Sequence, residues 1–351
     1  MRTRFFAFTA IAVLLINVAA FSRPDTAENA AKRRQVTRLV SMLPASDAVA
    51  VFDAKRFLND ALPKLLSSNA KMMAEVTSKL TEMETRTGID LRKFEQVAVG
   101  VAFKQVSAKE MDYDTVAVAS GDVNAGALVA VARLASKGTY RTEKIGERTV
   151  YVFSAKDVIQ KNTVTVNNSK VAGVIEDALK GISKDIAVTA FDSRTLVMGS
   201  LPRVTETLEA RSHVGTDVSS MLATRETAVA SFAARTPPGG MSKILPLDTD
   251  DFGASIDAIQ FIAGSVDVAT AGASVSVLAR TKQAEQAQNL RETLEGLQML
   301  GKAVFGSSKR ADQQVYGRMI RAAKFESVGT DLTFNLLVPQ SDIDVLVGGI
   351  K

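Results

Sequence analysis

The chain has 351 residues, of which 46% are apolar and 6% aromatic, and it contains neither cysteine nor tryptophan. This length allows two ordinary domains whose cores are packed mainly from Val, Ala, Leu, Ile and Met, without disulfides or zinc–thiolate sites. The formal net charge is +5. Without the two arginines of the first 22 residues it is 41 minus 38, or +3, which is too small a bias for general nucleic-acid binding.

The first 22 residues have the three-part pattern of a secretory signal. Arg2 and Arg4 precede an uncharged run from residue 5 to residue 21, and small residues follow. The 17-residue run lies at the lower limit for spanning a bilayer, so residues 5–21 are either cleaved off or retained as a membrane tether. Both alternatives place the rest of the chain outside the cytoplasm, in the periplasm or anchored to the inner membrane and facing the periplasm.

The next segment, residues 23–43, predicts a helical tether, with a helix over Ala27–Met42 that stops before Pro44. A later helix is predicted from the spacing of Met72, Met73, Val76, Leu80 and Met83, and it ends at Gly88.

Internal self-similarity organises the remaining chain. The stretch SMLPASDAVAVF at 41–52 recurs as SMLATRETAVASF at 220–232, and both contain Ser-Met-Leu followed by Ala-Val-Ala-x-Phe. Three further landmarks recur in the same order. They are a strand pair (97–103 with 116–120; 262–269 with 275–279), a helix (Ala125–Ala135; Gln283–Leu300) and a hairpin with a glycine at its turn (144–153; 327–337).

This order predicts an α+β fold made of two related repeats, each strand, helices, strand pair, helix, hairpin and helix, with mainly antiparallel sheets packed by helices. The first unit spans 44–218 and includes a strand-turn-strand-helix extension from residue 186. The second unit spans 219–351.

The stretches LPASDAVAVFD (43–53) and DSRTLVMGSLPRVTETLE (192–209) resemble uncharacterised families of exported bacterial proteins. The resemblance spans most of the chain after the signal segment. It implies the fold and the compartment and leaves the function open.

A glycine pair raises the question of a phosphate-binding loop. Gly121 and Gly126 have the glycine spacing of a P-loop, but Ala127 and Leu128 stand where its lysine and hydroxyl residue belong. We therefore predict a structural corner between a strand and a helix, one whose bend does not require glycine, and no cofactor.

Catalytic and metal-binding patterns are sparse. The only histidine, His213, lacks the context of a nucleophilic triad and fits a helix end. Asp248, Asp250 and Asp251 imitate the start of a calcium loop, but Phe252 occupies a ligand position and the closing glutamate is missing, so a solvated acidic loop is the preferred interpretation. No catalytic residue and no resident metal are predicted.

The segment from Lys302 to Lys324 has six basic residues against one acid. Four of them, Lys309, Arg310, Arg318 and Arg321, are candidates for contact with an anionic partner such as a lipid headgroup or an acidic envelope polymer; the alternative is a solvated surface.

Together these features predict a non-enzymatic extracytoplasmic protein that binds a ligand or an envelope protein, or that has a structural role. The alternative is an exported hydrolase whose carboxylates or Ser/Lys pair form no recognisable sequence motif.

Overall fold

The structure is a computed structural model, and it describes residues 27–107, 111–136, 138–154, 185–222, 228–237, 240, 250–306 and 308–348. The helices are α2 (Ala27–Met42), α3 (Ala54–Arg56), η1 (Phe57–Ala61), α4 (Leu62–Leu65), α5 (Ala70–Thr87), η2 (Leu91–Lys93), α6 (Ala125–Ala135), α9 (Leu201–Glu209), α10 (Thr216–Leu222), α11 (Asp250–Asp257), α12 (Ala284–Phe305), α13 (Ala311–Ala322) and α14 (Gln340–Gly348). The strands are β1 (Ala48–Asp53), β2 (Phe94–Gln105), β3 (Met111–Gly121), β4 (Tyr140–Ile145), β5 (Arg148–Phe153), β6 (Ile186–Asp192), β7 (Thr195–Gly199), β8 (Ala230–Arg235), β9 (Ile259–Ala269), β10 (Gly272–Thr281), β11 (Lys324–Val328) and β12 (Asp331–Pro339).

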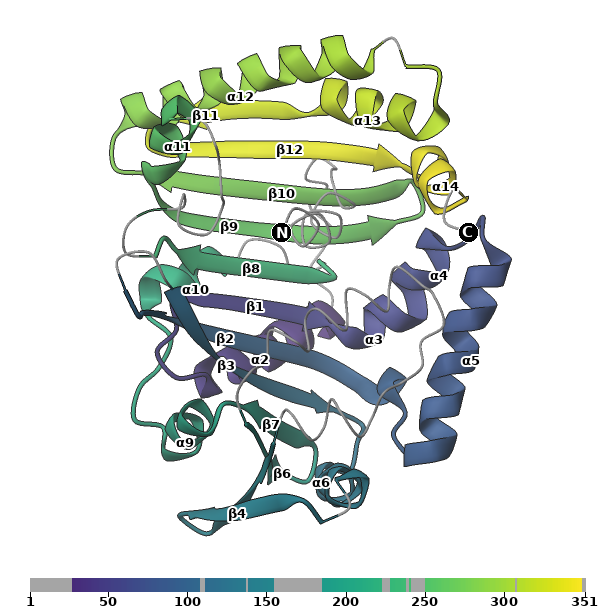
Figure 1. Ribbon diagram of the computed structural model, residues 1–351, viewed down its shortest axis with the longest axis vertical. Helices are drawn as coiled ribbons and strands as arrows, with labels where there is room; N and C mark the ends of the chain where they lie inside the picture. Colours follow the sequence, from purple (N-terminus) through teal and green to yellow (C-terminus); the bar gives the residue numbers. More distant parts are fainter. Residues whose placement is uncertain are drawn as a thin grey trace.

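The strands form a single sheet of twelve, in the order β11-β12-β10-β9-β8-β1-β2-β3-β7-β6-β5-β4 (Figure 1). Every neighbouring pair is antiparallel. The predicted α+β class, with antiparallel strands packed by helices, is therefore confirmed. The sheet runs through both predicted units, and they meet where β1 pairs with β8.

The local predictions agree closely with these elements. The helices predicted over Ala27–Met42 and Ala125–Ala135 are α2 and α6 with the same bounds. Both predicted hairpin glycines, Gly146 and Gly329, have a φ of 58°, a left-handed conformation that glycine adopts without strain. The second predicted repeat differs in its helical connection, because the helix expected to end at Leu300 continues to Phe305 and a further helix, α13, precedes the hairpin.

One face of the sheet packs against α2, α9 and α10. Successive side chains of a strand point to opposite faces, so β1 supplies Val49 and Val51 to this face, and β8 supplies Ala233. The buried helix residues opposite them include Leu39 of α2 and Val218 of α10. This core contains residues from both sides of the β1/β8 contact.

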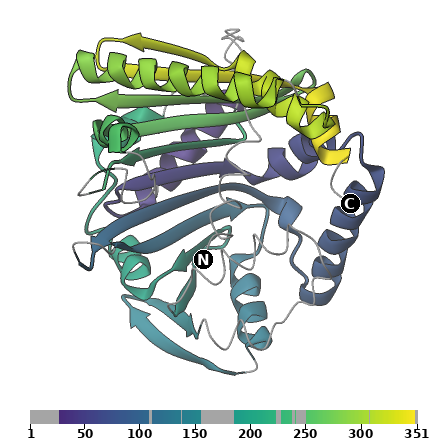
Figure 2. The same cartoon turned by 45° about the horizontal axis from the view of Figure 1, so that its top comes forward.

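The opposite face is covered by η1 and α4 near β1 and β9, and by other helices toward its two ends. Val275 of β10 and Leu336 of β12 pack with α13 and α14, and Ala279 of β10 packs with Leu290 of α12. At the far end, α6 covers β5 and β6. Figure 2 shows α12 lying across the end of the sheet that β11 and β12 form, as the outermost helix of the molecule.

An ion pair between β10 and β12 predicts how stability depends on pH. Arg280 Nε and Nη2 donate to the two carboxylate oxygens of Asp331 at 2.7 and 2.8 Å, and these bonds lower the pKa of Asp331 below its usual value. The folded protein then binds this proton less readily than the unfolded chain, so the stabilisation is present at neutral pH. We expect it to be lost as the pH falls below about 4, the range in which an unperturbed aspartate takes up its proton. In denaturant titrations at several pH values, Asp331→Asn should make the acid decline of stability shallower, whereas Asn at the exposed Asp122 should not.

Candidate functional site

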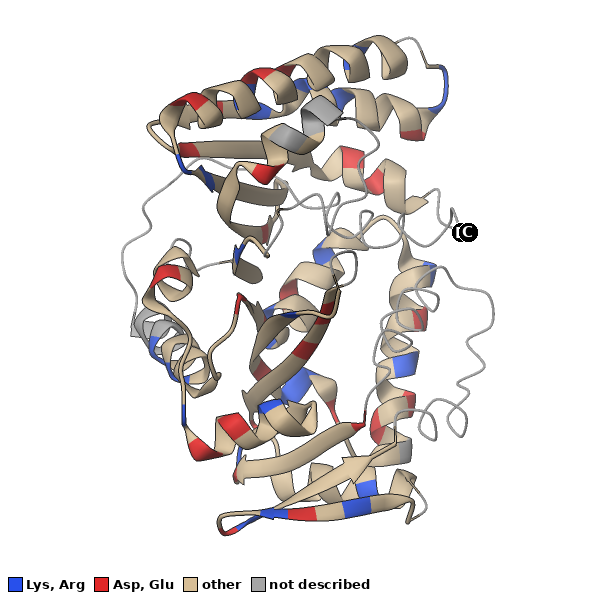
Figure 3. Ribbon diagram, turned by 60° about the vertical axis from the view of Figure 1, so that its left-hand side comes forward, with Lys and Arg blue, Asp and Glu red and all other residues tan. Residues whose placement is uncertain are grey.

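The helix α12 has two different exposed surfaces along its length. Its start is fixed by a capping box, in which Gln283 and Gln286 exchange side-chain and backbone hydrogen bonds, and its inner surface buries Ala287 and Leu290. From residue 284 to residue 295 the helix has three glutamates against one arginine, a net charge of −2. The segment 296–322 has five basic residues against one aspartate, a net charge of +4. Figure 3 shows this separation on the ribbon, with acidic residues (red) in the first half of α12 and basic residues (blue) toward its end and in the turn to α13.

The second half of α12 exposes large apolar side chains. Leu297, Leu300 and Val304 share one surface of the helix, because they are three, four and seven residues apart, and their exposed fractions are 44%, 65% and 69%. Met299 lies beside them and is 67% exposed. These four residues are called the apolar ridge below. Contiguous exposed apolar surface is uncommon on soluble proteins and marks interaction sites.

The ridge lies next to the surface of α12 that packs against α13, and this packing leaves it exposed. Gly301 faces Ile320 of α13, and a Cβ at Gly301 would lie 3.1 Å from the Ile320 side chain. Gln298 Nε2 donates to the carbonyl oxygens of Ile320 (2.6 Å) and Ala323 (2.8 Å), where α13 ends. These contacts fix the rotation of α12, so the ridge is held outward by tertiary packing.

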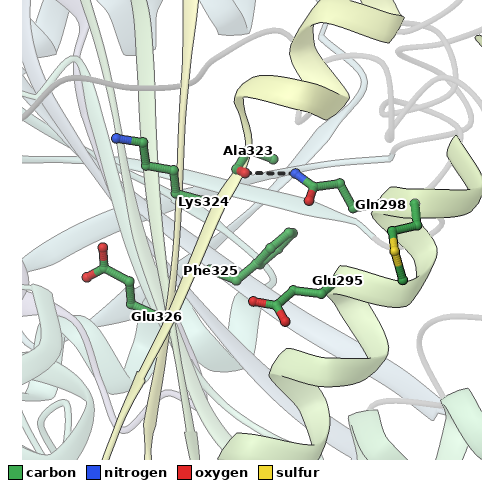
Figure 4. Close-up of a pocket in the computed structure, with 7 residues that line it drawn as sticks. Glu295, Gln298, Ala323, Lys324, Phe325 and Glu326 are labelled. Carbon is green, nitrogen blue, oxygen red and sulfur yellow. Dashed lines mark hydrogen bonds between the residues drawn. The ribbon is translucent and has the colours of Figure 1, made fainter. Parts of the chain in front are cut away.

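A pocket of about 490 Å³ lies beside the ridge, between α12 and the edge strand β11. It is lined by Glu295, Gln298, Met299, Ala323, Lys324, Phe325 and Glu326. Figure 4 shows the Phe325 ring directed toward α12, while Lys324 and Glu326 leave the strand on its other side. Glu295 is paired with Arg291 at 2.9 Å, and Lys324 and Glu326 have opposite charges, so the pocket is close to neutral overall.

The structure divides the four predicted basic residues into two kinds. Arg310 is paired with Asp312 at 2.7 Å, and Arg318 with Asp342 of α14 at 2.6 Å. The hydrogen bond from Arg310 lowers the pKa of Asp312, and the hydrogen bond to Asp342 raises the pKa of Arg318. The side chain of Asp342 is only 7% exposed, which makes Arg318 part of the packing between α13 and α14.

Lys309 and Arg321 are different, because neither is paired with a carboxylate among the described residues. Lys302, near the end of α12, lies on the side of the helix away from Leu300 and Val304, and among the described residues it donates to Gln298 at 3.2 Å. Lys302, Lys309 and Arg321 are called the basic rim below. They lie on α12, in its connection to α13, and on the helix packed against it.

A second charged cluster in the molecule is internally neutral. Arg56 is paired with Asp267 of β9 and donates to the Val268 carbonyl at 3.2 Å, and Lys64 is paired with Asp60 at 2.7 Å. Burial raises the pKa of Asp267, against the opposing effect of Arg56. With two acids and two bases, this cluster ties the end of β1 to β9.

The other residues singled out from the sequence are not brought together. Asp248 lies outside the described residues, as do the side chains of Asp250 and Asp251 at the start of α11. In the part of the chain that the structure describes, no three His, Asp or Glu side chains are grouped closely enough to hold a metal ion. His213 is exposed, and its Nδ1 lies 3.0 Å from the Ser41 carbonyl oxygen, which links the α9–α10 connection to the end of α2.

The Gly121–Gly126 corner requires glycine at one position for a reason that the sequence did not indicate. The N–H groups of Gly121 and Asp122 donate to backbone carbonyls of Arg194 and Lys93, so they are already used within the protein. Glycine is nevertheless required at 121, because a Cβ there would collide with the backbone of Lys93 to Glu95. The reason is close approach of a neighbouring strand and not the bend itself.

Comparisons with known proteins do not assign a family. No protein-family model and no curated protein matches the chain. Among solved structures, crystal form I of TP0453 aligns with a TM-score of 0.43 and 7% identity, covering 89% of this chain and 98% of that one. Forms III and IV align with a TM-score of 0.42 and 9% identity, covering 88% of this chain and 97% and 96% of the others. These values carry no functional inference.

The described helices include none that is both long and apolar enough to cross a bilayer. The predicted signal or tether over residues 5–21 lies outside the described residues.

The sequence predicted the helix that contains the apolar ridge but not the exposure of the ridge. One signal for it was present. Leu290 and Leu294 define a buried surface of the helix, and the spacing of Leu300 from both places it off that surface.

Proposed function

We propose that this chain is a non-enzymatic, extracytoplasmic protein of the cell envelope that binds a partner at the apolar ridge. The exposure of Leu297, Met299, Leu300 and Val304 on the outermost helix carries the proposal. A helix surface of this kind has a free-energy cost in water of about 25 cal/mol for each Å² of apolar area, which a partner would remove. The signal-like segment at the N-terminus supports the compartment.

A related proposal concerns the origin of the fold. We propose that the two predicted units are copies of one ancestral unit. Counting outward from the β1/β8 contact, the order is β1-β2-β3 on one side and β8-β9-β10 on the other, and a helix and a terminal hairpin follow on each side. Only the first side has an inserted pair, β6 and β7. The two Ser-Met-Leu triplets support the same relation, because both lie at the end of a helix that precedes the first strand.

Photo-crosslinking in intact envelopes tests the binding function. A photoreactive phenylalanine derivative replaces Leu300 in one variant and Asn289 in another. The two positions are three turns apart on the same exposed surface of α12, and Asn289 lies in the acidic half. We expect an adduct from position 300 and none from position 289. Equal labelling at both positions, or none at position 300, would contradict a partner at the ridge, and recovery of the protein with the cytoplasm would contradict export.

A further inference from the structure

The apolar ridge and the basic rim share one end of the molecule, and their combination points to a partner of definite chemistry. Resting on the function proposed above, we infer that the partner is the surface of an anionic lipid bilayer. The ridge enters the boundary between headgroups and acyl chains, and Lys302, Lys309 and Arg321 contact the negative headgroups.

The side chains at this surface fit a bilayer better than another protein. The ridge consists of aliphatic side chains on a helix that projects from the molecule, and the flanking charges are mainly lysines. Protein–protein interfaces are enriched in aromatic residues, methionine and arginine and depleted in lysine, and Met299 is the one ridge residue of those enriched kinds. Aliphatic side chains on one surface of a helix, with lysine and arginine beside them, are typical of helices that lie in the membrane interface.

The charge distribution selects which half of α12 makes contact. The first half has a net charge of −2 and would be repelled by an anionic surface, whereas the segment 296–322 has a net charge of +4. Arg310 and Arg318 are neutralised by ion pairs within the protein. The electrostatic attraction to the anionic lipid surface therefore comes from the basic rim. The inferred orientation places the C-terminal end of α12 at the lipid and directs Glu285 and Glu292 away from it.

The absence of tryptophan allows a direct measurement with the full-length protein. Leu300→Trp and Asn289→Trp each introduce a single fluorophore, the first in the ridge and the second in the acidic half. With vesicles of equal parts phosphatidylcholine and phosphatidylglycerol, we expect the emission of the Leu300→Trp protein to shift to shorter wavelength. The Asn289→Trp protein should show no shift, and neither should shift with pure phosphatidylcholine.

Vesicle co-sedimentation of variants measures the electrostatic and the apolar contributions to membrane binding separately. Lys309→Gln with Arg321→Gln should weaken binding about fivefold for each charge removed, and added salt should weaken it further. Leu300→Gln with Val304→Gln should weaken it by about tenfold or more. The matched control, Lys71→Gln with Lys79→Gln, removes the same formal charge from α5, on another side of the molecule, and should leave binding unchanged (Figure 1). Circular dichroism confirms that each variant is folded.

Three results would overturn the inference. They are the absence of vesicle binding, an equal blue shift at positions 289 and 300, and an equal loss of binding in the α5 control. Vesicle binding can fail while position 300 still forms an adduct with a protein, including a second copy of this chain. That pair of results would support the proposed binding function with a protein partner in place of the lipid. The absence of any adduct at position 300 would contradict both the proposed function and the lipid inference.

Discussion

Gly121→Ala is expected to lower the free energy of unfolding by about 3 kcal/mol, at the upper end of the usual range for overpacking. Gly121, the last residue of β3, pairs with Phe94 of β2, next to a shift in register between Phe94 and Gln96. A Cβ at position 121 would lie 2.7 Å from Phe94 Cα and 2.8 Å from the Glu95 nitrogen. These are backbone atoms of a paired strand, so they cannot move aside as a flexible side chain could.

The second glycine of the same motif provides the control. Gly126 lies in the first turn of α6, and a Cβ there would meet only Asn124 Oδ1, at 3.4 Å. Gly126→Ala should leave stability unchanged or raise it by up to about 1 kcal/mol, because alanine is the better helix former. Urea unfolding of both variants gives the comparison. Equal changes in the free energy of unfolding at the two positions would contradict the explanation that the close approach of β2 requires glycine at 121.

Cutting the chain between His213 and Val214 is expected to abolish folding of each part on its own. The cut lies in the connection between α9 and α10, and it separates β1 from β8 and divides the core that packs on α2. Val218 and Met221 of α10 lose their packing against the first part, which costs about 3–6 kcal/mol in lost burial. That loss is a large fraction of the roughly 5–15 kcal/mol that stabilises a typical domain.

Thermal unfolding followed by circular dichroism tests this expectation on fragments 23–213 and 214–351. Neither fragment should show a cooperative transition alone. Co-expression should restore a complex with one transition, and this result serves as the control that the cut itself is tolerated. A cooperative transition in either isolated fragment would show that the two units have separate cores.

The sequence was sufficient for the local elements because their signals are local. Alternating apolar residues in 97–103 and 275–279 depend only on the two-residue period of a strand, and the turn at Gly146 depends on the backbone freedom of one residue. The bounds of α2 and α6 followed from periodicity and from the residues that end a helix.

The candidate site was predicted only in part. The basic character of the segment 302–324 could be read from the sequence. The sequence did not show which of these charges are free to contact a partner and which form ion pairs within the protein. Arg318 is neutralised by Asp342, 24 residues further along the chain, and only the packing of α13 on α14 brings the two together. The exposure of the ridge depends in the same way on tertiary packing, since the contacts of Gly301 and Gln298 with α13 set which surface of α12 faces solvent.

Composition and periodicity alone therefore determined the α+β class, the order of strands and helices, and a core built without cysteine or tryptophan. Only the tertiary structure decided that β1 pairs with β8 to make one sheet, that Gly121 must lack a side chain, and that Leu300 faces outward while Leu290 is buried. The physical reason is the same in each case. Strand partners, close approaches and solvent exposure are set by contacts between residues far apart in the chain, and a local pattern carries no information about those contacts.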